Sequence, residues 1–214
     1  MITPAYLTRG SARKYLSALQ YTLYTHYTHY TYYTPKYPSA LQIWSSSSSG
    51  KYSESWSFKG HDSEVADIAV HPTGNYLISV TADESWFFLD IARGQCLKKV
   101  SKENEDFKYT SCAFHPDGLI LGTTTDKGTL KIWDIREQQN VANCDGHSGP
   151  INCLSFSENG YLVASGSDDG SAKIWDLRKL QCTKTLPSKL LYLFYSCLLF
   201  LTYPFRHFLY MNGR

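Results

Sequence analysis

A histidine, a serine and an aspartate that could form a catalytic triad lie close together in the second half of the sequence, at His147, Ser165 and Asp169. In a serine hydrolase, such a histidine takes the proton of the attacking hydroxyl while the aspartate orients the imidazole. The nucleophilic serine of an α/β-hydrolase stands in a Gly-x-Ser-x-Gly turn, and Ser165 has no such surroundings. We therefore expect a structural role for these residues and predict no catalytic residue in the chain.

The sequence also lacks the common metal, cofactor and phosphate motifs. Its six cysteines include no Cys-x-x-Cys pair, so neither a zinc site nor a redox pair is indicated. Asp168, Asp169 and Gly170 form a turn without the alternating acidic residues of a calcium loop, and no glycine-rich phosphate loop is present. His26 and His29 could bind a metal, but they belong to a Tyr/Thr repeat and we discount them. We predict no metal ion and no cofactor.

The segments that must position these side chains repeat along the chain. An Ile-Trp-Asp triplet that ends at Asp176 follows a second one that ends at Asp134 by 42 residues, and Asp90 lies 44 residues earlier still. Turns at 71–74 (HPTG), 115–118 (HPDG) and 157–160 (SENG) follow the same step. Each unit holds four short apolar runs separated by turn residues, which predicts four β-strands per unit.

Units of about 40–45 residues that hold four strands, open on Gly-His and close on Trp-Asp resemble the blades of WD-repeat β-propellers. The resemblance predicts an all-β fold, a partial WD-repeat β-propeller of about three four-stranded blades with irregular N- and C-terminal extensions. The blades are expected within residues 59–186, at about 59–100, 101–144 and 145–186. A remnant of a preceding blade is expected near 41–58, because 41–44 (LQIW) repeats the end of a unit.

The same resemblance implies a structural network in the third blade. In WD-repeat blades the loop histidine bonds to the turn aspartate, and a strand hydroxyl links on to the indole N–H of the tryptophan. The residues at those positions are His147, Asp169, Ser165 and Trp175. A chain of this kind satisfies polar groups that packing would otherwise bury without partners.

The first two blades keep only parts of this network. The members kept by the first are His61, Ser79 and Asp83, and those kept by the second are Thr123 and Trp133. Leu89 stands at the tryptophan position of the first blade. In the second, Lys127 stands at the aspartate position, the neighbouring Asp126 could partly substitute, and no Gly-His precedes the blade. We expect the third blade to be the most rigid and the second the least.

Several stretches are more particular than a generic blade. They are 114–123 (FHPDGLILGT), 140–151 (NVANCDGHSGPI), 156–161 (FSENGY) and 174–180 (IWDLRKL). In this order and spacing they closely resemble the C-terminal propeller of the pre-mRNA-processing factor 19 family. The resemblance covers about residues 60–186.

Membership of that family would imply a nuclear protein. Its full-length members resemble ubiquitin-protein ligases with an N-terminal U-box, a coiled coil that forms a tetramer, and a seven-bladed propeller. They act in pre-mRNA splicing and DNA repair, and the propeller recognises proteins. The partners implied are subunits of the spliceosome-associated complex and substrates of ubiquitination.

The sequence departs from the family pattern at its N-terminal end. Residues 1–55 show neither a U-box pattern nor coiled-coil heptads, so we expect the tetramer-forming region to be absent and the chain to be inactive as a transferase on its own. Three complete blades leave an open array, and open arrays expose apolar faces at both ends. Residues 56–186 alone are therefore expected to be poorly soluble or to need a partner.

Both ends of the chain differ from the repeats. Residues 1–55 form a low-complexity extension rich in Tyr, Thr and Ser, in which Tyr recurs every third residue over 21–35. The two interpretations are a disordered tail and an expanded nucleotide repeat or translated non-coding sequence. Residues 187–214 form an apolar tail, and 190–205 hold 16 residues without a charge, fewer than the 20 or so that a membrane span needs.

The overall charge narrows the choice of partners. With 21 Lys and Arg against 19 Asp and Glu, the net charge of +2 indicates no direct binding of nucleic acid. The leading prediction is a protein-interaction and substrate-recognition propeller fragment of a ligase of the family named above. The alternatives are a WD-repeat scaffold of another multiprotein complex, and a protein attached to a membrane through 190–205, which we do not favour.

Overall fold

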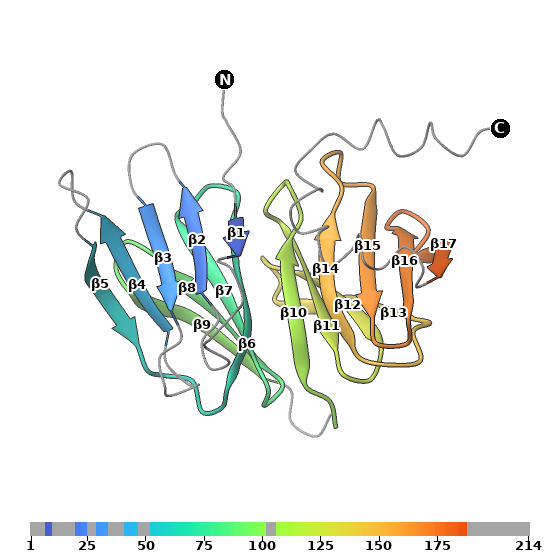
Figure 1. The fold of residues 1–214 in the computed structure, drawn as a ribbon, viewed down its shortest axis with the longest axis horizontal. Coiled ribbons are helices and arrows are strands. Elements are labelled where there is room, and N and C mark those ends of the chain that lie inside the picture. Colours follow the sequence, from blue (N-terminus) through green and yellow to red (C-terminus); the bar gives the residue numbers. More distant parts are fainter. Residues whose placement is uncertain are drawn as a thin grey trace.

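The computed structural model describes residues 7–9, 20–24, 29–33, 41–46, 52–101 and 106–187, with side chains in 41–43, 53–101 and 106–187. Every regular element in this part of the chain is a β-strand, and the described residues contain no helix (Figure 1). This confirms the predicted all-β class. The side chains of His26 and His29, and the apolar tail beyond Pro187, lie outside the described residues.

The strands form four antiparallel sheets, each with its strands in chain order. The first sheet contains β1 (Leu7–Arg9), β2 (Gln20–Tyr24), β3 (His29–Tyr33), β4 (Leu41–Ser46) and β5 (Tyr52–Phe58). The first blade contains β6 (Val65–Val70), β7 (Tyr76–Thr81), β8 (Ser85–Asp90) and β9 (Gln95–Ser101). The second contains β10 (Tyr109–Phe114), β11 (Ile120–Thr125), β12 (Thr129–Asp134) and β13 (Gln139–Asp145). The third contains β14 (Ile151–Phe156), β15 (Leu162–Ser167), β16 (Ser171–Asp176) and β17 (Gln181–Pro187).

Three four-stranded sheets in succession confirm the partial propeller. The strands β1 to β3 arise from the Tyr/Thr-rich extension and continue the first sheet outward from β4 and β5. The division of the chain into an extension, a repeat region and a tail stays a prediction.

The hairpin turn between the first two strands of each blade has one repeated geometry. In every blade the amide of the turn glycine donates to a carbonyl three residues earlier, at 2.8 or 2.9 Å. The glycines Gly74, Gly118 and Gly160 have φ of 74°, 76° and 75°. Glycine adopts this left-handed conformation without strain, so the Gly at the end of each predicted turn has a direct conformational cause.

The apolar core lies between neighbouring sheets. One cluster joins β4 to the first blade, a second joins the first blade to the second, and a third joins the second to the third. Their large members include Leu41, Ile43, Phe87 and Leu89 in the first cluster, Trp86, Tyr109, Leu121 and Trp133 in the second, and Leu130, Ile132, Val163 and Trp175 in the third. Complete burial of one such side chain contributes about 1.5–3 kcal/mol, so the blades hold one another together.

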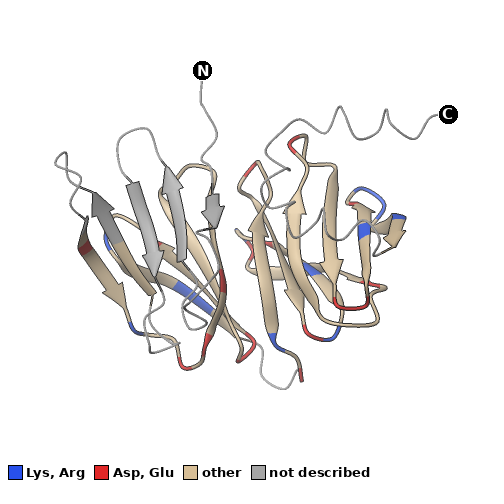
Figure 2. Cartoon of the chain, in the orientation of Figure 1, with Lys and Arg blue, Asp and Glu red and all other residues tan. Residues whose placement is uncertain are grey.

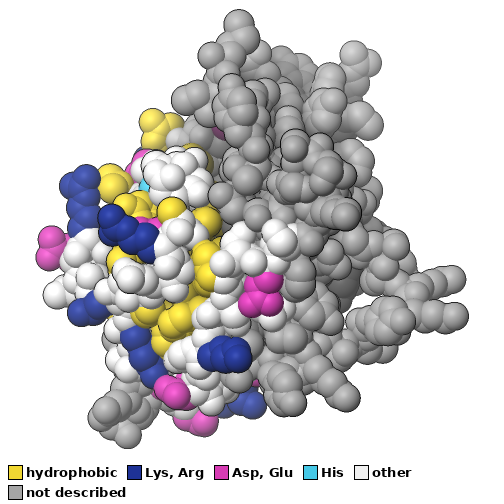
Figure 3. Space-filling view, turned by 90° about the vertical axis from the view of Figure 1, so that its left-hand side faces the viewer, with side chains coloured by type: hydrophobic (Ala, Val, Ile, Leu, Met, Phe, Trp, Pro, Cys, Tyr) yellow, Lys and Arg dark blue, Asp and Glu magenta, His cyan; other side chains and the backbone are white. Residues whose placement is uncertain are grey.

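Most charged residues lie at the edges of the sheets. Figure 2 shows Lys, Arg, Asp and Glu mostly at the turns and on the outer strands of the described part. At the left-hand end of Figure 1, apolar side chains reach the surface with Lys and Arg around them (Figure 3). The ends of the blades therefore carry the groups that a partner could recognise.

Candidate protein-interaction site

The polar network of the third blade connects β15 and β16 to the loop before β14. His147 lies with Nδ1 at 2.8 Å from Oδ2 of Asp169 and with Nε2 at 2.8 Å from Oγ of Ser165. The indole N–H of Trp175 donates to the same Ser165 hydroxyl at 2.8 Å. The structure thus brings all four residues of the predicted set together.

Burial and hydrogen bonding set the ionisation of this network. Burial lowers the pKa of His147 below its ordinary value, against the opposing effect of Asp169. Burial alone would raise the pKa of Asp169, but hydrogen bonds from Ser171, His147 and the Ser148 amide hold it well below its usual range. The network therefore joins a neutral imidazole to a carboxylate.

The geometry does not suit acyl transfer. Ser165 is 2% exposed, and its hydroxyl accepts the indole N–H of Trp175. A substrate carbonyl has no approach to an oxygen buried between the strands, and nucleophilic catalysis requires that approach. The arrangement can orient a turn and satisfy buried donors.

The first blade assembles a smaller set. His61 Nε2 lies 2.7 Å from Ser79 Oγ, and the imidazole packs edge-on against Phe87 with ring centroids 4.6 Å apart. Asp83 accepts a hydrogen bond from the Thr81 hydroxyl in the turn that follows β7. Leu89, at the tryptophan position, is fully buried in the first cluster.

The second blade retains one link of the network. The indole N–H of Trp133 donates to the Thr123 hydroxyl at 2.9 Å, and Thr123 is fully buried. Lys127, at the aspartate position, lies 3.4 Å from Asp106 at the surface. Asp126 accepts the Lys108 amide at 2.8 Å and so supports the entry into β10.

Two histidines from the predicted turns, His71 and His115, link one blade to the next. Nε2 of His71 lies 3.1 Å from the carbonyl oxygen of Gly118, and Nε2 of His115 lies 2.9 Å from that of Gly160. The repeated His-Pro dipeptide is the one feature of the sequence that points to these histidines. The dipeptide does not indicate that each imidazole contacts a turn 45 or 47 residues later in the chain.

The surface around these turns carries exposed apolar side chains. Leu119 and Tyr161 follow the turn glycines of the second and third blades and are 40% and 53% exposed, and Leu180 in the β16–β17 turn is 46% exposed. The Arg178 guanidinium lies 4.9 Å from the centroid of the Tyr161 ring. Exposed apolar groups next to an Arg are typical of protein-binding surfaces. We call Leu119, Tyr161, Arg178 and Leu180 the Tyr161 surface.

Arg178 has a fixed position on this surface. Its backbone amide and Nε donate to Oδ1 of Asp176, and Nη2 lies 2.8 Å from Oδ2. The hydrogen bond from Arg178 lowers the pKa of Asp176 to about 2. A guanidinium oriented in this way loses little side-chain entropy when a partner binds.

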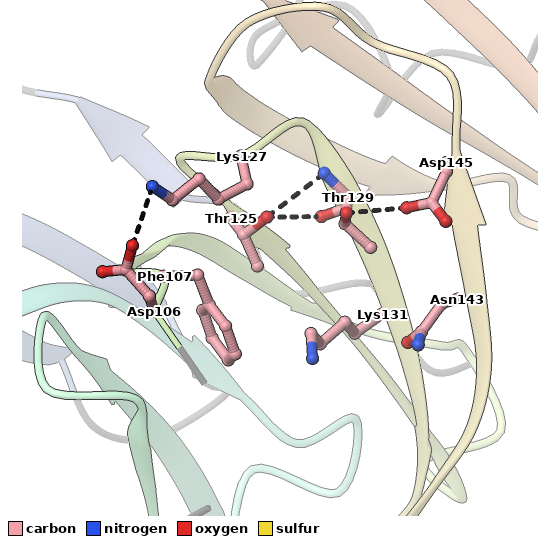
Figure 4. Close-up of a pocket in the computed structure, with 8 residues that line it drawn as sticks. All are labelled: Asp106, Phe107, Thr125, Lys127, Thr129, Lys131, Asn143 and Asp145. Carbon is pink, nitrogen blue, oxygen red and sulfur yellow. Dashed lines mark hydrogen bonds and ion pairs between the residues drawn. The ribbon is translucent and has the colours of Figure 1, made fainter. Parts of the chain in front are cut away.

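A pocket of about 390 Å³ opens at the opposite end of the second blade, beside the β11–β12 turn (Figure 4). Its lining residues are Asp106, Phe107, Thr125, Lys127, Thr129, Lys131, Asn143 and Asp145. The Thr129 amide donates to the Thr125 hydroxyl at 3.1 Å, and the Thr129 hydroxyl donates to Asp145 at 2.7 Å. These bonds fix one wall of the pocket.

In the described part of the chain, no group of three or more His, Cys, Asp or Glu side chains is placed to hold a metal ion. Within the same residues, no helix has the length and apolar character to cross a membrane.

Comparison with known proteins identifies the repeats. The family model described as "WD domain, G-beta repeat" matches residues 52–88, 94–134 and 138–176, which together make up more than half of the chain. Each match begins with or just before the last strand of one sheet and ends within or at the close of the third strand of the next. The repeat in the sequence therefore bridges two sheets in the structure.

The chain is also similar to curated proteins with related names. Pre-mRNA-processing factor 19 homolog 2 of Arabidopsis thaliana is 44% identical over 118 residues, 55% of this chain and 22% of that protein. Pre-mRNA-processing factor 19 of Bos taurus is 47% identical over 98 residues, 46% of this chain and 19% of that protein. The protein of that name from Dictyostelium discoideum is 38% identical over 108 residues, 50% of this chain and 21% of that protein. The chain spans about a fifth of the length of these relatives.

Proposed function

Because the chain belongs to the WD-repeat family, we propose that it serves as a protein-interaction propeller segment in pre-mRNA processing. The observation that carries this proposal is the similarity to proteins named pre-mRNA-processing factor 19 from plants, animals and Dictyostelium, at 38–50% identity over up to about half of the chain. The matched repeats cover the strands from β5 to β16 apart from short gaps, and β17 of the third blade follows them.

The Tyr161 surface is the site that we assign to this role. Tyrosine and arginine dominate the binding energy of many protein interfaces because they combine large contact area with polar groups. Here the Tyr161 ring, 53% exposed, lies beside an Arg178 that Asp176 already orients. The hydrogen bond between His115 and Gly160 places the turns of the second and third blades side by side, so Leu119 extends the same surface.

A more specific proposal concerns the cellular process in which this segment acts. We infer that the segment recognises substrates for a ubiquitin-protein ligase of this family, and that it acts in the nucleus in splicing and DNA repair. The resemblance of 114–123, 140–151, 156–161 and 174–180 to the family propeller supports this inference. Subunits of the spliceosome-associated complex are the partners that we expect.

Affinity purification of the tagged full chain from nuclear extract, followed by mass spectrometry, tests the proposal. We expect pre-mRNA-processing proteins to be enriched over a tag-only control. Tyr161→Ser should reduce their recovery several-fold, because it removes an exposed aromatic contact without touching the core. Leu97→Ser is the matched control, since Leu97 is 46% exposed on β9, away from the turns.

Two outcomes would contradict the proposal. A reproducible set of partners without pre-mRNA-processing proteins would assign the chain to another WD-repeat assembly. If Tyr161→Ser and Leu97→Ser reduced the recovery of partner proteins equally, the partners would not bind at the Tyr161 surface. The membrane alternative depends on residues 190–205, which lie outside the described residues, and carbonate extraction of the tagged chain tests it directly.

A further inference from the structure

The turn between β14 and β15 contains an Asn-Gly pair (Figure 1). Asn159 is exposed, and Gly160 follows it at a φ of 75°. An asparagine loses its side-chain amide most readily when glycine follows, because no Cβ shields the backbone nitrogen that attacks the carboxamide. The other exposed asparagines of the described residues precede Tyr or Cys, and they are Asn75, Asn143 and Asn152. Asn159 is therefore the exposed asparagine of this part of the chain that is best suited to deamidation.

The reaction needs water as its sole co-reactant. The backbone nitrogen of Gly160 attacks Cγ of Asn159, so the N–Cγ bond forms, the Cγ–Nδ2 bond breaks, and ammonia leaves with the proton of the Gly160 amide. Water then opens the succinimide ring at one of its two carbonyls. Opening at the side-chain carbonyl leaves aspartate. Opening at the backbone carbonyl leaves isoaspartate, which adds a methylene to the main chain.

The carboxamide of Asn159 is already held by two donors. Its Oδ1 accepts the Ser157 hydroxyl at 2.7 Å and the Tyr161 amide at 3.1 Å. Both donors face the oxygen on which negative charge develops during the attack, so they favour the reaction. The same donors also suit a carboxylate. Asp117 occupies the corresponding position of the second blade and accepts the Leu119 amide at 2.7 Å, which shows that aspartate fits this turn.

The nucleophile, in contrast, is restrained. The Gly160 N–H donates to the Ser157 carbonyl at 2.9 Å, and the Gly160 carbonyl oxygen lies 2.9 Å from His115 Nε2 of the second blade. The Gly160 nitrogen must lose its proton and turn toward Cγ before it can attack, and these hydrogen bonds oppose both changes. The reaction therefore requires local opening of the turn, and the contact from the second blade keeps the turn closed.

We propose that Asn159 is a deamidation site that His115 protects, so that its conversion follows the separation of the second and third blades. The aspartate product places a negative charge next to the Tyr161 amide, and the isoaspartate product lengthens the main chain just before Tyr161. Deamidation thus changes the Tyr161 surface. Its effect on partners rests on the function proposed for that surface, whereas the reaction itself does not.

The test is peptide mapping by mass spectrometry of the full chain during incubation at pH 8. We expect the peptide with Asn159 to gain the mass difference between an amide and an acid, while the peptides with Asn75, Asn143 and Asn152 stay unchanged. The Asn212–Gly213 pair lies outside the described residues and is followed in its own peptide.

Variants separate the site from its protection. His115→Ala should speed the conversion several-fold, because the turn opens more often. His71→Ala removes the matching contact between the first and second blades and should leave the rate unchanged. Asn159→Gln should prevent the conversion, since the longer side chain would have to close a less favourable six-membered ring.

Several results would overturn the proposal. Absence of conversion in His115→Ala, equal rates in the unmodified sequence and His115→Ala, or equal acceleration by His71→Ala would each do so. If His115→Ala unfolds the chain, the unmodified sequence in urea below its unfolding transition decides the question. Its conversion should then rise in step with hydrogen exchange of the Gly160 amide, and a rate independent of urea would contradict the protection.

The effect on partners has a separate readout. The incubated chain should recover fewer partner proteins than the fresh chain, whereas Asn159→Gln should lose none during incubation. Unchanged recovery after measured conversion would contradict the effect on the Tyr161 surface and leave the site itself established. Loss of partners in Tyr161→Ser does not depend on Asn159, so failure of either proposal can be recognised.

Discussion

The imidazole of His115 in the second blade lies with Nε2 at 2.9 Å from the backbone carbonyl oxygen of Gly160 in the third. The same contact joins His71 of the first blade to Gly118 of the second, at 3.1 Å. A Cβ at Gly160 would meet His115 Nε2 at 2.3 Å. Gly160 is thus required for two reasons. It adopts the left-handed conformation of the turn, and its lack of a side chain leaves room for the imidazole of His115.

Gly160→Ala should lower the free energy of unfolding by about 1–3 kcal/mol, because Ala at φ of 75° is strained and its Cβ meets the imidazole. His115→Ala should cost about 1 kcal/mol through the lost hydrogen bond. The cost of Gly160→Ala should be smaller in the His115→Ala background, since the clash is then gone. Urea unfolding of the four variants measures the coupling, and strictly additive effects would contradict the contact.

Asp169→Asn should destabilise the chain by about 1–3 kcal/mol. The substitution removes the carboxylate that bonds His147 and the Ser148 amide in a partly buried turn. Asp168→Asn is the matched control, because Asp168 is the exposed neighbour and bonds Asn152. Denaturant midpoints of the two variants give the comparison, and similar losses would show that the network adds little to stability.

Stability should fall in two steps as the solution is acidified. The pKa of His147 is below its ordinary value of 6.5 in the folded chain, so the unfolded chain takes up the proton first and stability declines as the pH falls below about 6.5. Asp169 and Asp176 both have pKa values below the ordinary 3.8, so a second decline begins below about that pH. Urea midpoints between pH 8 and pH 3 should show both steps. In His147→Gln the first step should shrink, and an unchanged profile would remove His147 as its source.

Hydrogen exchange should rank the blades by the completeness of their networks. Amides of β16 in the third blade are expected to be better protected than those of β12 in the second, because four side chains close the third network and two remain in the second. Mass spectrometry after deuterium labelling of the full chain measures this difference. Equal protection of β12 and β16 would mean that packing between blades outweighs these networks.

Much of the fold could be predicted from the sequence, because the residues that specify the turns and strand ends act on the backbone next to them. The turn glycines at 74, 118 and 160 need a left-handed conformation, and the Trp-Asp pairs end the third strand in the second and third blades. Both features reflect the backbone within a few residues. The four-stranded units could therefore be predicted before any contact between blades was known.

The parts of the site that could not be predicted depend on distant contacts. His115 reads as a turn residue until the third blade is placed against the second. Lys131 lies in a strand pattern that would suit an exposed lysine, yet it is buried against Phe107. Asp83 was grouped with His61 and Ser79 from the family pattern, and the structure adds a bond to Thr81 that the pattern does not contain. Spacing shows which residues share a blade but gives no information about the packing partner.

Phe107 has two roles in the structure. It lines the pocket of the second blade, and it belongs to the apolar cluster that also contains Trp86 of the first blade. Any change that orders or displaces Phe107 in the pocket therefore also acts on the joint between the two blades. By thermodynamic linkage, whatever separates those blades must loosen this wall of the pocket, and whatever holds the wall in place must oppose their separation. The order of the pocket wall and the cohesion of the array are thus governed by one equilibrium.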